Sequence, residues 1–477
     1  MNTTLAEKMA AKETLEVISP ITGEVVEKVG LQSTADVDKA VDKAKEAFNS
    51  WSKRTLRDRS QILYTYRNLL KASMPSLAEI IRVENGKTYN EAKAEVEKAI
   101  EVTEFACSLP QLNLDTCSEV SRGIYCRMSK KPLGVVASIT PLNFPCMVPH
   151  WTIPIAIALG NCMILKPSEQ VPLTGLKIEQ LFLQAGVPEG VFQVVNGKAD
   201  IAQAITQHPD IKAVSFVGST KVAKLVYEAS CKTGKRALCL GGAKNHLLVL
   251  PDANPKMAGA DIAASMSGCA GQRCMAASVL VAVGDVQSII KSVVDEAKKL
   301  IPGQNLGAIT TCSSKERIEG YISQAIEQGA TLLLDGRGVV VEGKENGFYV
   351  GPTILDNVTP DMAISNQEVF GPVLSIMHVD TVDEAIALQN KSNYGNGASV
   401  FTQSGSIATK VAEELKAGMI GVNIGVPVPR EPFSFGGWDD SRFGVGDITG
   451  ESSIDFWTQR KKITTKWNAE DKKDWMS

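Results

Sequence analysis

The sequence has no large excess of charge of either sign. Its 477 residues include 50 lysines and arginines against 53 aspartates and glutamates, for a net charge of −3. A chain that binds nucleic acid or an anionic membrane through a broad basic surface needs a clear cationic surplus. We therefore expect neither a nucleic-acid nor a membrane partner, and small molecules are the better expectation for its ligands.

Long apolar runs and metal-ligand clusters are also missing. The stretch MNTTLAEKMAAKETLEV lacks the apolar centre of a secretory signal, and no later segment offers roughly twenty consecutive apolar residues. Ten cysteines are scattered without CxxC pairs, as expected of reduced thiols, so we predict a cytoplasmic protein. With only four histidines and no cluster at metal-ligand spacing, we expect no catalytic metal.

The order of apolar patterns predicts an α/β fold. Residues 35–107 show helical periodicity. From Gly134 onward, runs of strand length (VVASI, CMILK, AVSFVG, HLLVL) alternate with helical segments, and a second series from Lys244 includes VLVAV, ATLLL and VLSIM. We therefore expect two doubly wound, Rossmann-like sheets with a cleft between them. The segments RGIYCRMSKKPLG and IDFWTQRKKITTKW alternate like exposed strands that could pair with a neighbouring subunit.

A candidate nucleophile lies in the segment SMSGCAGQRCMAAS. Cys274 follows a glycine-rich turn and stands next to Arg273, a setting that can expose a thiol and favour its thiolate. The alternative is a structural cysteine buried among small residues, which the spacing alone favours.

Polar residues follow several predicted strands, where α/β proteins bind ligands. Asn143 in PLNFP could donate to a developing oxyanion, or simply close a turn. Lys166 and Glu169 in LKPSE could reach a nucleotide ribose, or form an ordinary capping pair. Ser219 in FVGST opens a helix that could receive a phosphate, although a plain serine cap is the more common role.

Taken in order, PLNFP, LKPSE, FVGST, LGGAKNH, GQRC, EVFGP and NYGNGASVFT resemble the aldehyde dehydrogenase superfamily across nearly the whole chain. The resemblance implies that Cys274 is the nucleophile and that Asn143, with the Cys274 backbone N–H, donates to the oxyanion. It implies NAD as cofactor, because Glu169 would repel a 2′-phosphate. The implied cofactor contacts are Thr140, Leu142, Lys166, Glu169, Gln170, Gly218, Ser219, Gly241, Glu368 and Phe370.

The resemblance also implies the domain plan. Residues 1–118 and 134–241 would form the NAD-binding domain, residues 242–453 the catalytic domain, and residues 119–133 and 454–477 the oligomerisation strands. A homodimer or homotetramer is therefore expected.

The position of the usual general base separates this chain from hydrolytic members. Those carry a glutamate in an ELGGK-like motif, and counting back from the nucleophile places Leu240, between Cys239 and Gly241, at that position. The AKNH and GQRCMA motifs resemble instead the methylmalonate-semialdehyde dehydrogenase branch. Its members resolve the thioester with coenzyme A and release an acyl-CoA, here expected from methylmalonate or malonate semialdehyde.

Two cations are candidates for binding an acid group on the substrate. In the same branch the arginine beside the nucleophile, here Arg273, helps to bind a carboxylate, although an intramolecular ion pair is an alternative role. Lys98 stands where the branch has a second arginine, so charge is kept without the bidentate fork. Leu142 replaces a frequent phenylalanine. The alternatives are a non-acylating dehydrogenase of a succinate, sulfonate or phosphonate semialdehyde, and a catalytically silent structural relative.

Overall fold

The computed structural model describes residues 13–112 and 114–467. An antiparallel hairpin of β1 (Thr14–Ile18) and β2 (Val25–Gly30) precedes four helices. These are α2 (Thr34–Trp51), α3 (Leu56–Ala72), α4 (Met74–Asn85) and α5 (Tyr89–Ser108). Each buries apolar residues at helical spacing, so the helices predicted over residues 35–107 are confirmed.

The first large sheet has the strand order β19-β9-β8-β5-β6-β7. The strands are β5 (Val135–Ile139), β6 (Cys162–Lys166), β7 (Phe192–Val194), β8 (Ile211–Val217), β9 (Arg236–Leu240) and β19 (Arg442–Gly444), of which β19 alone is antiparallel to its neighbour. Helices α6 (Met147–Ala158), α7 (Pro172–Gln184), α8 (Ala199–Gln207) and α9 (Thr220–Lys232) connect them. Both β5 and β6 are buried throughout, as expected of a parallel sheet covered on both faces.

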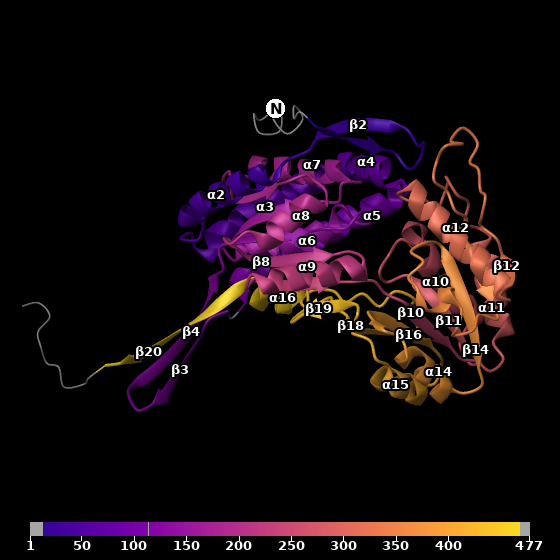
Figure 1. Cartoon of the computed structure of the whole chain (residues 1–477). Coiled ribbons are helices and arrows are strands. Elements are labelled where there is room, and N and C mark those ends of the chain that lie inside the picture. Colours follow the sequence, from indigo (N-terminus) through magenta and orange to yellow (C-terminus); the bar gives the residue numbers. More distant parts are fainter. Residues whose placement is uncertain (1–12, 113, 468–477) are drawn as a thin grey trace, which may run out of the picture.

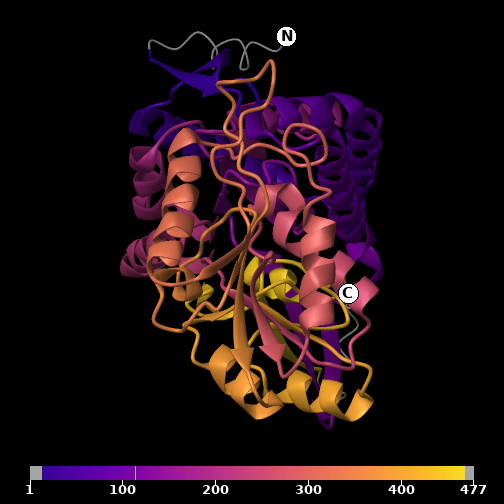
Figure 2. The ribbon, with the colours of Figure 1, turned by 90° about the vertical axis from the view of Figure 1, so that its right-hand side faces the viewer.

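The second large sheet has the order β12-β13-β14-β11-β10-β16-β17 and lies beside the first (Figures 1 and 2). Its strands are β10 (Asn245–Val249), β11 (Ala277–Val283), β12 (Thr331–Leu334), β13 (Thr353–Asp356), β14 (Val373–Val379), β16 (Gly397–Phe401) and β17 (Met419–Val422). The helices of this half are α10 (Pro255–Ser267), α11 (Gln287–Ala297), α12 (Cys312–Glu327), α13 (Ala363–Asn366), α14 (Val382–Asn390) and α15 (Gly405–Glu414). The predicted pair of doubly wound sheets is confirmed.

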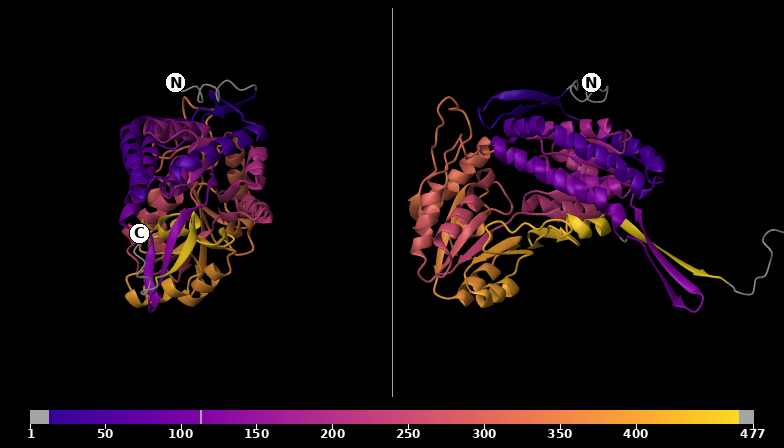
Figure 3. Two further views of the ribbon diagram at one scale, coloured as in Figure 1. Left: turned by 90° about the vertical axis from the view of Figure 1, so that its left-hand side faces the viewer. Right: turned by 180° about the vertical axis from the view of Figure 1, so that it is seen from behind.

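A three-stranded antiparallel sheet extends away from the body as an arm (Figures 1 and 3). Its strands are β3 (Thr116–Ser121), β4 (Ile124–Pro132) and β20 (Thr458–Lys466), which follows α16 (Gly450–Phe456). A two-stranded ribbon of β15 (Tyr394–Gly395) and β18 (Trp438–Asp439) completes the strands. The predicted domain plan also includes residues 1–12, 113 and 468–477, which lie outside the described residues.

The described part of the chain contains no helix long and apolar enough to cross a membrane. Nor does that part contain a group of three or more His, Cys, Asp or Glu side chains placed to hold a metal ion.

Candidate active site

A cavity of about 670 Å³ lies at the carboxyl ends of β5, β6 and β8, beside the segment that carries Cys274. This is the edge of a parallel sheet at which α/β proteins bind ligands. The predicted site residues among those lining it are Thr140, Leu142, Asn143, Lys166, Glu169, Gly218, Ser219, Gly241, Cys274, Glu368 and Phe370. The structure therefore brings together residues that lie more than two hundred positions apart in the sequence.

Three predicted residues lie elsewhere. Gln170 is exposed and directs its backbone N–H to the Ser168 hydroxyl, 3.3 Å away. Arg273 does not line this cavity. Its Nη2 donates to the carbonyls of Ala264 and Ser265, each at 3.0 Å. Arg273 has no ion-pair partner among residues 13–112 and 114–467, so the intramolecular ion pair that the sequence left open is not formed there.

Lys98 is paired with acidic side chains. Its Nζ lies 3.0 Å from Glu101 Oε2 and 3.2 Å from Glu431 Oε2. Its ammonium is thus already neutralised by two carboxylates, one of them contributed by a distant loop. Sequence alone could not reveal the second partner, which follows Lys98 by 333 positions.

The loop before Cys274 has an unusual backbone. After α10, Cys269 and Ala270 adopt positive φ angles of 55° and 53°, and Gly271 follows at 69°. A left-handed conformation costs a residue with a side chain roughly 1–2 kcal/mol, so surrounding contacts must hold the loop. One such contact is the Cys269 N–H, which donates to Glu91 Oε1 on α5 at 2.6 Å. The loop is thereby tied to the helical layer before it reaches Cys274.

Two asparagines hold the backbone at Cys274. Asn245 Nδ2 donates to the carbonyls of Cys274 and Ala276, both at 2.8 Å, and Asn396 Nδ2 donates to the Cys274 carbonyl at 2.9 Å. Asn245 comes from AKNH and Asn396 from NYGNG. Both motifs are evident in the sequence, but the sequence did not predict that their asparagines position Cys274. A motif does not identify the carbonyl to which its amide donates.

Burial, and to a lesser extent the nearby carboxylate of Glu368, raise the pKa of the Cys274 thiol to about 12. Arg273 lowers it by less. Arg273 therefore favours the thiolate in the direction that the sequence predicted, but burial outweighs it. The reason is geometric, since the guanidinium of Arg273 turns toward the carbonyls of α10 and the thiol is only partly exposed.

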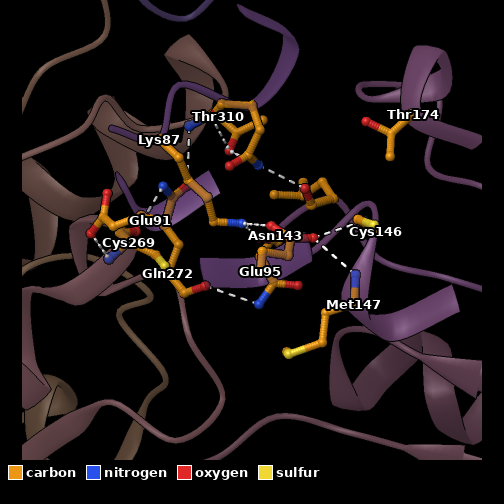
Figure 4. Close-up of polar contacts among 12 residues, drawn as sticks. Lys87, Glu91, Glu95, Asn143, Cys146, Met147, Thr174, Cys269, Gln272 and Thr310 are labelled. Carbon is orange, nitrogen blue, oxygen red and sulfur yellow. Dashed lines mark hydrogen bonds and ion pairs between the residues drawn. The ribbon is translucent and has the colours of Figure 1, made fainter. Parts of the chain in front are cut away.

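Asn143 is positioned by a buried ion pair (Figure 4). Its Nδ2 donates to the Gln272 carbonyl at 2.9 Å, two residues before Cys274, and its own backbone carbonyl accepts from Lys87 Nζ. Lys87 Nζ also lies 2.6 Å from Glu95 Oε2, and these two side chains are 2% and 0% exposed. Glu95 Oε1 accepts the backbone N–H groups of Cys146 and Met147 at 2.7 and 3.0 Å.

Sequence reasoning missed Lys87 and Glu95. Lys87 lies in the short loop between α4 and α5, and Glu95 lies on α5. Two charged residues eight positions apart are expected at the surface unless their common burial is known. In the structure they hold the middle of the PLNFP loop and the residues that follow it, and the side-chain amide of Asn143 reaches the segment before Cys274.

Polar side chains at the ends of β5, β6 and β8 face the cavity. Lys166 Nζ lies 3.6 Å from Glu169 Oε2, and burial lowers the pKa of this lysine. The N-cap of α7 is Val171, so Lys166 and Glu169 do not form the capping pair that was the alternative role. Ser219 caps α9, yet its hydroxyl makes no capping hydrogen bond. The Thr140 hydroxyl is buried and has no hydrogen-bond partner among the described residues.

The expected place of a hydrolytic base holds no acid or base. Leu240 is the buried last residue of β9, and the Gly241 N–H donates to the Ser441 carbonyl at 2.9 Å. The carboxylates among the cavity's described lining are Glu169 and Glu368. Glu368 Oε1 accepts from the Ala243 N–H at 3.0 Å, and burial raises the pKa of Glu368 to about 7.

Residues 7–463, which include the two sheets and the cavity at their strand ends, match the aldehyde dehydrogenase family. The chain belongs to that family. It is 43% identical over 463 residues to malonate-semialdehyde dehydrogenase 1 of Geobacillus kaustophilus, covering 96% of this chain and 95% of the relative.

Solved structures show the same likeness. A Sinorhizobium meliloti protein assigned as a methylmalonate-semialdehyde dehydrogenase, solved in complex with NAD, superposes with a TM-score of 0.95 at 40% identity, covering 97% of this chain and 96% of the other. The methylmalonate-semialdehyde dehydrogenase of Oceanimonas doudoroffii gives a TM-score of 0.94 at 40% identity, with 96% of each chain covered.

Proposed function

We propose that this chain oxidises a small acid-bearing aldehyde, malonate or methylmalonate semialdehyde, with NAD, and passes the resulting acyl group from Cys274 to coenzyme A. The names of its relatives support the substrate class. The main support for acyl transfer to coenzyme A is the set of residues at the cavity. It holds Cys274 and Asn143, while Leu240 occupies the place of the water-activating glutamate.

The cavity wall fits a dinucleotide. The partnerless Thr140 hydroxyl, the free cap hydroxyl of Ser219 and the buried ammonium of Lys166 offer polar groups at the strand ends. Glu169 would accept from a ribose 2′-hydroxyl and repel a 2′-phosphate, which favours NAD over NADP. When bound, NAD supplies the hydride acceptor.

The protein residues divide the remaining work. The Cys274 sulfur, once deprotonated, attacks the aldehyde carbon and forms a hemithioacetal oxyanion. The amide of Asn143 and the Cys274 backbone N–H are the donors proposed for that oxyanion. Loss of hydride leaves a thioester on Cys274. The carboxylate of this malonyl thioester leaves as carbon dioxide, and a proton from solvent replaces it on the α-carbon. The coenzyme A thiol then gives up its proton and attacks the thioester carbonyl, and the Cys274 sulfur leaves as acyl-CoA forms.

The test is product analysis. Wild-type protein would be given NAD with malonate or methylmalonate semialdehyde, with and without coenzyme A, and the products identified by mass spectrometry. The proposal expects acetyl-CoA and propionyl-CoA, respectively, formed together with NADH. Free acid produced equally fast without coenzyme A would refute acyl transfer, and no turnover of either aldehyde would refute the substrate assignment.

A second candidate, a non-acylating dehydrogenase, is favoured by one observation. Glu368 lines the same cavity as Cys274, and its pKa of about 7 suits a general base. If Glu368 activates water, free acid forms without coenzyme A, and Glu368→Gln abolishes its release while leaving acylation of Cys274.

We also propose that the arm formed by β3, β4 and β20 mediates assembly into a dimer or tetramer. The arm leaves the body and presents the open edges of β3 and β20. Light scattering should give twice or four times the mass of 51.1 kDa. A monomer at micromolar concentration would refute the proposal.

A further inference from the structure

We propose that Thr310 is a positioning residue for the oxyanion step, because its hydroxyl closes a ring of hydrogen bonds that joins the loop of Asn143 to the loop of Cys274. The inference deepens the function proposed above and rests on it. Thr310 is not among the described residues that line the cavity, so it acts through Asn143, which does line it.

Thr310 lies in a stretch of chain that packs closely against the end of α4. The Ala308 N–H donates to the Gly86 carbonyl at 2.8 Å. A Cβ atom at position 307 would lie 2.6 Å from the same carbonyl oxygen, so the close approach requires the glycine that is found there. Residues 307–310 are thereby held against the loop between α4 and α5.

The Thr310 hydroxyl makes two hydrogen bonds with Asn85, the last residue of α4. It donates to the Asn85 backbone carbonyl at 3.2 Å and accepts from Asn85 Nδ2 at 3.3 Å. The same Nδ2 donates to the Leu142 carbonyl at 2.8 Å, in the peptide unit that precedes Asn143. The hydroxyl therefore fixes the direction of the amide that holds the loop of Asn143.

The backbone of Thr310 reaches the other loop through Gln272. The Thr310 N–H donates to Gln272 Oε1 at 3.0 Å, and Gln272 Nε2 donates to the carbonyls of Ala308 and Cys269 at 3.2 and 3.3 Å. The Gln272 carbonyl accepts from Asn143 Nδ2 at 2.9 Å, which closes the ring (Figure 4). The two loops are thus joined twice, once directly by the Asn143 amide and once through Thr310.

The ring is shielded from solvent. Asn85, Asn143, Gln272 and Thr310 are 2%, 6%, 4% and 5% exposed. Polar groups buried this deeply depend on protein partners for their hydrogen bonds. One N–H of the Asn143 amide is committed to the Gln272 carbonyl, so the other N–H is left in a fixed direction for an oxyanion.

The test compares Thr310→Val, which keeps the shape and loses the hydroxyl, with Thr310→Ser, which keeps the hydroxyl. The control is Thr103→Val, because Thr103 is buried on α5 and its hydroxyl donates to the Ala99 carbonyl at 2.8 Å. Each protein is mixed with saturating NAD and malonate semialdehyde without coenzyme A, and the rate of the NADH burst reports acylation of Cys274. Thr310→Val should slow the burst about threefold to tenfold, Thr310→Ser should stay within about twofold of wild type, and Thr103→Val should match wild type.

A double-mutant cycle separates positioning from a loss of folding. If Thr310 acts through Asn143, Thr310→Val should change the slow burst of Asn143→Ala by less than about twofold. Alkylation of Cys274 by iodoacetamide forms no oxyanion, so Thr310→Val should leave its rate unchanged. A wild-type burst in Thr310→Val, the same loss in the Asn143→Ala background, or an equal loss of alkylation would overturn the inference.

Failure of the proposed function gives a different result. Wild type that forms no NADH from malonate or methylmalonate semialdehyde refutes the substrate assignment. The same variants are then compared with propanal, because the ring acts on the aldehyde oxygen whatever chain carries it. A slower burst of Thr310→Val with propanal would still support the inference, and an unchanged burst would overturn it.

Discussion

Replacing Glu95 by glutamine should weaken both the fold and the catalytic step. The change removes the counter-charge of Lys87 at a site where both side chains are essentially inaccessible to solvent. Removing one partner of a buried ion pair costs about 3–5 kcal/mol, because the other charge stays buried and unpaired. The glutamine oxygen can still accept from the Cys146 and Met147 N–H groups. Lys87 therefore loses its counter-charge, and its hydrogen bond to the Asn143 carbonyl is weakened.

For Glu95→Gln we expect a thermal unfolding midpoint lower by roughly 5 °C, measured by calorimetry, and a kcat at least about tenfold lower. Glu97→Gln removes the same charge from an exposed position on α5 and should match wild type. Lys87→Met/Glu95→Gln should recover much of the stability without the activity, because no buried charge is left unpaired and yet Asn143 has lost its support. A Glu95→Gln protein as stable and active as wild type would refute the reasoning.

Three further predictions concern Cys274, Asn245 and Glu169. Because burial raises the pKa of Cys274 to about 12, its alkylation by iodoacetamide, followed on its peptide by mass spectrometry, should rise about tenfold per pH unit from about pH 7 to pH 9, and a plateau in that range would contradict this. Asn245→Ala leaves the Cys274 and Ala276 carbonyls without this donor and should lower kcat at least about tenfold, whereas unchanged kcat would exclude a positioning role. Glu169→Gln should raise the NADP-to-NAD ratio of kcat/KM about tenfold, and a constant ratio would exclude Glu169 from cofactor choice.

The fold was largely predictable from the sequence because its elements have strong local patterns. VVASI and CMILK are strands that are buried on both faces, and such strands are continuous apolar runs. The ordered motifs then indicated which strand ends carry polar residues. Since parallel strands of one sheet end at the same edge, Asn143, Lys166 and Ser219 were expected near one another, and they line one cavity.

Side-chain direction and burial could not be predicted in the same way. Arg273 and Cys274 are adjacent in sequence, but the Arg273 guanidinium donates to a carbonyl of α10. Desolvation is the largest influence on the pKa of the Cys274 thiol. Lys98 was expected to meet a substrate anion, yet it meets Glu431, which reaches it only after the chain has crossed from the second sheet. Such pairings depend on the tertiary fold and leave no local pattern.

The most direct test of the acyl-transfer mechanism is a single-turnover experiment without coenzyme A. Wild-type protein mixed with NAD and malonate semialdehyde should release close to one NADH per active site and then stall, with an acyl group on the Cys274 peptide by mass spectrometry. Adding coenzyme A should discharge that adduct as acetyl-CoA and restart turnover. Steady NADH formation without coenzyme A, with free acid as product and no adduct on Cys274, would contradict the account.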